Sequence, residues 1–486
     1  MNFKSFSEFP AELITMIVLY VENPLDRYNL ARSSRRLFPI VQDTKWESIE
    51  SEGYKFFIPL VRMLNRDPNR AKEVKSIHIT GSISRRKLPC SKASFEAFAS
   101  YMCKTGIIDR DITGMHDYFD RANYQFKDLI GTIFVHWGFY MLDYLKNGDP
   151  SQPLSLLILH LPQLRELTID NGIFIWISNH PAYRDCFPNL HTLRLGSKEI
   201  VRSLNFQVFT LPQIRTIECF NVGSAYTMPK NKTVPLTSLS LTWTDLLEFE
   251  RRPEARILDS GLANLLNACR SLKSLKLHGR MPKEQYLPST TRGGVTWLRL
   301  RQLRQAIRAL APTLETLALD FDWDEYCKII PNDPYSISLA GFFNLKELAV
   351  RYDYMVRASY DYLMARNLPL SPTLATTLPP NLKKLTLFRF TFGDHNIDDL
   401  YNLAWKKREA HPNLRKVTVY YILGGLTQHH SDISSVFNRV RFDCEKEGIE
   451  IQFQAQRFEI LRDTFWLPPD AEKWQAANIL GQDCRR

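Results

Sequence analysis

The sequence predicts an α/β fold made of stacked repeats, on two observations. One is an apolar hexad, Leu-x-x-Leu-x-Leu with Ile, Val or Cys substitutions, that recurs about ten times. The other is helix-like apolar spacing between the hexads. Clear hexads start at Leu164, Leu190, Leu236, Leu272, Leu314 and Leu382, and weaker ones at Val74, Ile214, Leu345 and Leu414. A motif repeated at this scale is typical of a solenoid, in which each unit covers the apolar face of its neighbour.

Each hexad has the pattern of a short strand. Its second and third apolar positions are two residues apart, so they face the same side of an extended chain. A proline stands one or two residues before many hexads and favours the end of the preceding helix at that point. These prolines are Pro162, Pro188, Pro212, Pro312, Pro380 and Pro412.

The segments between hexads are predicted to be helices. Apolar residues recur three or four positions apart within 262–269, 303–310 and 397–404, which is the spacing of a buried helix face. After His429 the pattern predicts a closing helix and then a last strand at Ile449–Phe453. Strands that alternate with helices form a parallel sheet with helices on its outer side.

The spacing of the hexads favours leucine-rich repeats. The first three steps after Leu164 are 26, 24 and 22 residues, within the roughly 20–29 residues of such repeats. Later steps are longer, so we expect longer helices or inserted loops, and no regular ladder of Asn follows the hexads. We predict an irregular horseshoe over residues 161–455, with strands on the concave face and helices on the convex face. An ordinary α/β domain with coincidental leucine spacing is the alternative.

Residues 1–48 are predicted to form three short helices. The first opens at Pro10 and carries Leu13, Ile14 and Ile17 at helix spacing. We expect Pro24 to end it and Asp26 to cap the second helix. Three helices in about 40 residues cannot hide this much apolar surface. They therefore dock on a partner or cap the first repeat.

This N-terminal segment resembles an F-box. The similarity covers residues 7–48, a tenth of the chain, and Phe9 and Asp26-Arg27 stand where the family usually has Leu and Asp-Leu. Its fragments are Phe9-Pro10-x-Glu12-Leu13-Ile14-x-x-Ile17, Pro24-Leu25-Asp26, Leu30, Ser34-Arg35-Arg36-Leu37 and Trp46. An F-box followed by leucine-rich repeats is similar to the substrate receptors of fungal type.

The resemblance implies a substrate-recognition subunit of a Skp–cullin–F-box type ubiquitin ligase. The F-box would bind a Skp-type adaptor, and through it a cullin, while the repeats hold an unknown protein substrate. Some of the residues carried over to the adaptor contact must instead hold the three helices together. The residues carried over are Phe9, Pro10, Leu13, Ile14, Ile17, Leu30 and Leu37. The alternative is a leucine-rich-repeat scaffold with no ubiquitin-ligase role.

The substrate is expected on the concave face. The third and fifth hexad positions and the residue after the hexad point there, and extended partners commonly bind such a face. The candidate contacts are Thr168, Arg194, Phe220, Lys276, His278, Arg351, Phe388 and Tyr420. The three aromatic residues are either exposed anchors, as in many interface hot spots, or packed beneath inserted loops.

Two further regions complete the expected domain organisation. Residues 49–160 are expected to form a helical linker and the first repeat with a helical insert, rich in aromatic residues from Phe95 to Tyr144. Residues 456–486 are expected to be a C-terminal extension.

The formal net charge of +11 raises the possibility of a nucleic-acid partner. The second hexad position is basic in most units, at Lys75, Arg165, Arg215, Lys273, Lys346, Lys383 and Arg415. We interpret this row mainly as a solvated edge and expect no nucleic-acid partner. Such a row can still attract an acidic partner, with binding that weakens as salt is added.

Several classes of protein are not indicated. No apolar run approaches the ~20 residues of a membrane span, and the start has no signal-peptide core. The eight Cys form no Cys-x-x-Cys pair, so we expect no zinc or redox site and an intracellular protein, cytoplasmic or nuclear. The sequence has no phosphate-binding Gly loop, no Gly-x-Ser-x-Gly elbow and no His-Glu-x-x-His. We therefore expect a non-catalytic protein without cofactors.

Overall fold

The computed structural model shows an α/β protein with an open, parallel, twelve-stranded sheet. The strands follow one another in the sheet in the order of the sequence. The residues that the structure describes are 9–21, 24–34, 36–37, 47–52, 57–80, 100, 154, 157–170, 187–196, 208–209, 211–219, 233–243, 258–279, 305–321, 339–355, 373–390, 394–421 and 430–455. The predicted aromatic helices of 95–144 and the extension at 456–486 lie outside them.

Every predicted hexad forms a strand, and each of these strands begins at the third hexad position. The strands with a hexad are β2 (Ser76–Thr80), β3 (Glu166–Asp170), β4 (Thr192–Gly196), β5 (Thr216–Cys219), β6 (Ser238–Trp243), β7 (Ser274–Gly279), β8 (Thr316–Phe321), β9 (Glu347–Arg351), β10 (Lys384–Phe390) and β11 (Lys416–Tyr421). Two strands lack a complete hexad, β1 (Ser48–Glu52) and β12 (Glu450–Ala455). The last strand was predicted, but β1 was not, since Ile49 is the one apolar residue within it.

The helices that the spacing predicted between hexads are present where the structure describes the chain. Residues 262–268 lie in α11 (Leu258–Ala268), residues 305–309 of the predicted segment 303–310 are helical, segment 397–404 lies in α16 (Asp394–Trp405), and the closing helix is α18 (His430–Lys446). Further helices among the described residues are α1 (Ala11–Tyr20), α2 (Pro24–Ser33), α4 (Phe57–Arg66), the 3-10 helix η3 (Pro68–Lys72), α13 (Tyr352–Met355), α15 (Leu374–Thr377) and α17 (Lys407–Ala410).

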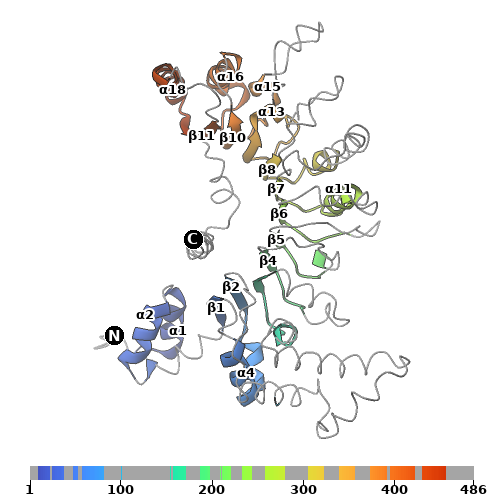
Figure 1. Cartoon of the computed structure of the whole chain (residues 1–486), viewed down its shortest axis with the longest axis vertical. Coiled ribbons are helices and arrows are strands. Elements are labelled where there is room, and N and C mark those ends of the chain that lie inside the picture. The colour runs from blue at the N-terminus through green and yellow to red at the C-terminus, as the bar shows by residue number, and fades with distance from the viewer. Residues whose placement is uncertain are drawn as a thin grey trace, which may run out of the picture. The chain divides into compact units, whose positions relative to one another are not determined.

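The chain divides into two compact units. The first comprises Met1–Ser197 with Leu211–Ile214 and contains α1, α2, α4 and strands β1 to β4; the second comprises Lys198–Thr210 with Arg215–Arg486 and contains β5 to β12. In the second unit, β6, β7 and β8 lie side by side with α11 on one side of them (Figure 1). The alternation of strand and helix therefore produces the arrangement expected of a repeat protein.

The hexad side chains form the core. All three apolar positions are buried in each unit, for example Leu236, Leu239 and Leu241 of the β6 unit. Burying one such side chain contributes about 1.5–3 kcal/mol, and a single unit would expose it, so the strands stabilise one another by stacking. Within the second unit, α18 packs on both α16 and β12.

The backbone joins successive units in the same way along the sheet. The carbonyl of the second hexad position accepts hydrogen bonds from two successive N–H groups of the next unit. The Lys346 carbonyl accepts from Lys383 N at 2.7 Å and from Lys384 N at 3.0 Å, and the Lys383 carbonyl accepts from Arg415 N at 3.0 Å. This repeated geometry keeps equivalent hexad positions opposite one another in neighbouring strands.

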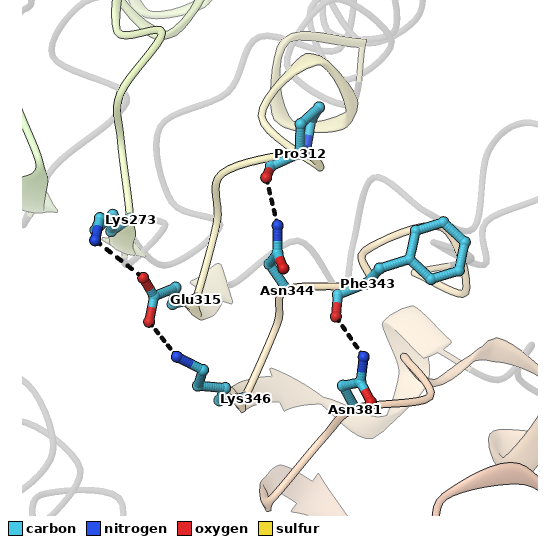
Figure 2. A network of polar contacts seen from close by, with 7 residues as sticks. All are labelled: Lys273, Pro312, Glu315, Phe343, Asn344, Lys346 and Asn381. Carbon is cyan, nitrogen blue, oxygen red and sulfur yellow. Dashed lines mark hydrogen bonds and ion pairs between the residues drawn. The ribbon is translucent and has the colours of Figure 1, made fainter.

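Asparagines that precede the hexads tie adjacent turns together (Figure 2). The Asn189 amide donates to the Pro162 carbonyl at 3.0 Å, and the Asn381 amide donates to the Phe343 carbonyl at 2.8 Å. The Asn413 amide then donates to Asn381 Oδ1 at 3.2 Å. The sequence has no regular ladder of Asn after the hexads; the Asn that bridge adjacent turns stand immediately before the first leucine of a hexad.

Replacing Asn381 by Ala should lower the free energy of unfolding by about 0.5–1.5 kcal/mol, the net value of a typical hydrogen bond. The variant loses the donor to Phe343 and the acceptor for Asn413. Urea unfolding followed by circular dichroism measures the change. Asn438→Ala, on the exposed side of α18, is the control and should change stability by less than about 0.5 kcal/mol. Equal effects of the two substitutions would contradict a stabilising role for the Asn381 hydrogen bonds between adjacent turns.

Buried thiols make the fold sensitive to alkaline pH. Burial raises the pKa of the Cys269 thiol from 9.0 to about 12. Because the folded value is the higher one, the neutral thiol stabilises the fold fully below pH 9.0, and this contribution is lost as the pH rises toward 12. Cys269→Ala should therefore make the fall of unfolding free energy above pH 9.0 shallower, by up to about 1.4 kcal/mol per pH unit. Urea titrations at several pH values test this, and identical slopes would contradict it.

Among the described residues, no helix combines the length and apolar character needed to cross a bilayer.

Candidate docking site on the first helix

Helix α1 starts at Ala11, and Pro10 is its N-cap residue. The fixed φ of proline suits this position, and Glu12 lies in the first turn, where its charge complements the helix dipole. The Ile14 N–H donates to the Pro10 carbonyl at 3.1 Å. The helix therefore begins one residue after Pro10, which the sequence analysis had placed in its first turn.

The boundary between the first two helices differs from the prediction. α1 ends at Tyr20, and Pro24 is the first residue of α2, so this proline begins a helix instead of ending one. Asp26 consequently lies in the first turn of α2 and not at its cap. The physical reason is that the missing N–H of proline costs nothing in a first turn, where backbone donors have no helical partner.

One side of α1 forms a small core with the rest of the segment. Ile14, Val18 and Leu37 are fully or almost fully buried, and Phe9 and Leu30 pack against them while partly exposed. These five residues form the inner cluster. They bring together the start of α1, the end of α2 and the turn that follows it.

Hydrogen bonds fix the turn after α2. The Leu37 N–H donates to the Ser34 carbonyl at 3.1 Å, and the Ser33 hydroxyl donates to the Leu30 carbonyl at 2.7 Å. The Arg36 guanidinium reaches back and donates to the Phe9 carbonyl at 3.2 Å. The Ser-Arg-Arg-Leu step of the sequence thus connects the turn to the start of α1.

The opposite side of α1 is apolar and exposed. Relative exposure is 45% for Leu13, 55% for Met16, 40% for Ile17 and 83% for Tyr20. The four residues follow the i, i+3, i+4, i+7 spacing of one helix face, and we name them the α1 outer face. A helix that is apolar on two sides normally has a partner on each; here the inner cluster supplies one of them.

The structure divides the residues that the F-box resemblance carried over to an adaptor contact. Leu13 and Ile17 belong to the α1 outer face, and Pro10 is exposed beside it. Ile14 and Leu37 lie inside the inner cluster, where they hold the helices together, with Phe9 and Leu30 at its margin. Met16 was missed, although its position three residues after Leu13 would have revealed it.

The predicted substrate residues lie in matching register on the sheet face opposite the hexad core, but most are covered. Thr168, His278, Arg351 and Phe388 are buried, whereas Arg194, Lys276 and Tyr420 are partly exposed; Phe220 lies outside the described residues. The first four therefore lie on the predicted face but are not accessible to a partner in this structure.

Small neighbours explain why Phe388 is not an exposed anchor. Ala318 and Ala349, on β8 and β9, form an apolar cluster with Phe388, against which Tyr420 packs. The rings of Phe388 and Tyr420 are 5.7 Å apart. Burial also raises the pKa of Tyr420. The aromatic pair follows the packed alternative of the sequence analysis.

Buried polar groups lie close together at two places in the second unit. On β7 and β8, His278 Nδ1 lies 3.1 Å from Asp320 Oδ2, and both side chains are nearly inaccessible. Between α13 and α16, the Tyr352 hydroxyl donates to Asp399 Oδ2 at 2.8 Å. Burial, with the Asp399 charge beside it, raises the pKa of Tyr352. The Tyr352–Asp399 hydrogen bond satisfies two polar groups that would be costly to bury alone.

Ion pairs partly neutralise the basic row at the strand starts. Glu315 accepts from Lys273 at 3.2 Å and from Lys346 at 2.5 Å (Figure 2). The hydrogen bond from Lys346, followed by that from Lys273, holds the pKa of the Glu315 carboxyl below its usual value. In the first unit, Lys75 is similarly 2.5 Å from Glu47. Interleaved carboxylates of this kind disfavour a nucleic-acid backbone on this row.

Comparison of the sequence with protein-family models and with curated proteins gives no match. The assignment of function therefore depends on the residues themselves.

Proposed function

We propose that this chain is the substrate-recognition subunit of a Skp–cullin–F-box type ubiquitin ligase. The observation that carries the proposal is the α1 outer face, which is exposed while the inner cluster holds the N-terminal helices together. The F-box-like sequence of the segment supports a Skp-type adaptor as the partner that covers this face. A cullin would then be reached through the adaptor.

The residue types and spacing of the α1 outer face suit a contact with another protein. Burying a Leu, Ile or Met side chain fully is worth about 1.5–3 kcal/mol, and Leu13, Met16 and Ile17 are each about half exposed. Tyr20 adds an aromatic side chain, a residue type enriched at binding hot spots. An apolar stripe with i, i+3, i+4, i+7 anchors is the pattern by which a helix docks in an apolar groove.

The alternative in which the N-terminal helices only cap the first repeat is less well supported. A cap would bury the apolar stripe on the repeat beside it, yet all four residues of the α1 outer face stay at least 40% exposed. The helices cover their inner cluster without using this stripe.

The proposed receptor performs no bond chemistry of its own. It would hold a protein substrate on the repeat sheet and so raise the concentration of that substrate near the ubiquitin-loaded enzyme. The repeated backbone hydrogen bonds keep the strands of the sheet in register for such binding. The proposal places the protein inside the cell, in the cytoplasm or nucleus.

The test is co-expression of the full chain with a Skp-type adaptor, followed by gel filtration and mass measurement. We expect a stable complex with one adaptor per chain. A folded chain that elutes free of the adaptor would contradict the proposal. It would favour the alternative, a leucine-rich-repeat scaffold with no ubiquitin-ligase role.

A further inference from the structure

Two exposed cations lie on neighbouring strand starts of the second unit without a counter-charge. Lys383 and Arg415 both occupy the second hexad position, and Arg415 N donates to the Lys383 carbonyl at 3.0 Å. Both side chains are exposed. Within the part of the chain that the structure describes, neither makes an ion pair or a side-chain hydrogen bond.

Three partly exposed lysines extend this positive region. They are Lys346, Lys384 and Lys416, with side-chain exposures of 50%, 60% and 39%. Together with Lys383 and Arg415 we name them the strand-start patch. Each of the five is either the first residue of β10 or β11 or the residue directly before β9, β10 or β11.

The carboxylates in this region are already engaged. Glu347 lies 2.7 Å from Lys384, and Glu450 lies 3.4 Å from Lys416. Glu315 is shared between Lys346 and Lys273. Among the described residues of this region, three carboxylates therefore face six cations: Glu315 is shared by two lysines, and Lys383 and Arg415 have no carboxylate of their own. Exposed charges that lack a partner attract opposite charge over about a Debye length, roughly 8–10 Å.

An exposed aromatic ring lies in the turn beside the patch. Phe343 is 65% exposed, and Figure 2 shows its ring pointing away from Asn381 and from the Lys273–Glu315–Lys346 ion pairs. Asn381, two residues before Lys383, fixes the Phe343 carbonyl. A ring on a fixed backbone loses little conformational freedom when it is covered, which favours its use as an anchor.

We propose that the strand-start patch and Phe343 bind an acidic segment of a partner protein that also carries an apolar side chain. Its carboxylates would pair with Lys383 and Arg415, and its apolar side chain would cover Phe343. The interleaved carboxylates of Glu315, Glu347 and Glu450 favour a short acidic peptide over a nucleic acid, whose continuous phosphates they would repel. This site is on the second unit and does not depend on the proposed adaptor contact.

The experiment uses the full chain and a fluorescein-labelled peptide of alternating Glu and Leu, with the matching Gln–Leu peptide beside it. Fluorescence anisotropy should show binding of the acidic peptide, and the Kd should rise as salt is added. The pair Lys383→Glu and Arg415→Glu should raise that Kd by about tenfold or more. Phe343→Ala should raise the Kd without changing its dependence on salt.

The control pair is Arg165→Glu and Arg270→Glu, which changes the net charge equally at exposed arginines elsewhere. It should leave the Kd within about twofold, since charges beyond a Debye length are screened. An equal loss in the control pair, or equal binding of the Gln–Leu peptide, would overturn the proposal. Tighter binding of a DNA duplex than of the acidic peptide would also overturn it. If the Glu pair fails to fold, as judged by circular dichroism, the pair Lys383→Gln and Arg415→Gln replaces it.

Discussion

Replacing both Leu13 and Ile17 by Asp is expected to abolish binding of a Skp-type adaptor while the chain remains folded. Both side chains belong to the α1 outer face, at 45% and 40% exposure. In the free chain the aspartates would remain in water, so the fold loses little. In the complex they would place two charges against an apolar surface, which is costly without partners. If each costs at least about 2 kcal/mol, as hot-spot residues do, the Kd rises roughly a thousandfold.

Isothermal titration calorimetry with purified adaptor measures this loss. The matched control is Trp405→Asp with Phe442→Asp, because these exposed apolar residues, 67% and 68% accessible, lie on α16 and α18. The control should bind the adaptor like the wild type. Undiminished binding by the Leu13 and Ile17 variant would show that the adaptor uses another surface. Equal loss in both variants would indicate a general effect of added charge.

Replacing Ile14 by Ala is expected to unfold the N-terminal helices while leaving the repeat sheet intact. Ile14 is fully buried in the inner cluster with Val18 and Leu37. Truncating a buried Ile to Ala costs about 2–5 kcal/mol, and a segment this small has little stability to spare. Adaptor binding would then be lost through unfolding and not through removal of a contact.

Limited proteolysis separates these two routes. Cleavage within residues 9–37 should become fast in the Ile14→Ala variant, with the repeat core still resistant. Met16→Ala is the control in the same helix, since Met16 is 55% exposed, and its stability should change by less than about 0.5 kcal/mol. Equal protease resistance of Ile14→Ala and Met16→Ala would contradict the assignment of Ile14 to the inner cluster.

The repeat sheet could be predicted from the sequence because each strand carries its own signal. Two leucines spaced two residues apart must share a face, and burial of that face requires a neighbour, so the hexads located β2 to β11. The start of β1 could not be found in this way, because Ile49 has no second apolar residue at the required spacing within the strand.

Side-chain exposure was less predictable, since it depends on contacts between units. Strand alternation places Phe388 opposite the hexad core, but its burial depends on Ala318 and Ala349 from two other strands. The buried side of helix α1 was unpredictable for a related reason. Leu13 and Ile14 each begin a series of apolar residues at helix spacing, and the spacing alone does not say which series faces the inner cluster. The packing of Leu37 against Ile14 decides it.

The repeated backbone ladder has a consequence for how this chain can change over time. Most strands are positioned by their own hexad and by a carbonyl of the repeat before, while the starts of successive hexads from Leu164 onward are 22 to 42 residues apart. We expect insertions and deletions between hexads to leave the hydrogen bonds between strands in alignment, because the entropy cost of closing a chain segment rises only slowly with its length. The segment between any two hexads can therefore change in length or sequence independently of the others, while the pairing of the strands stays the same.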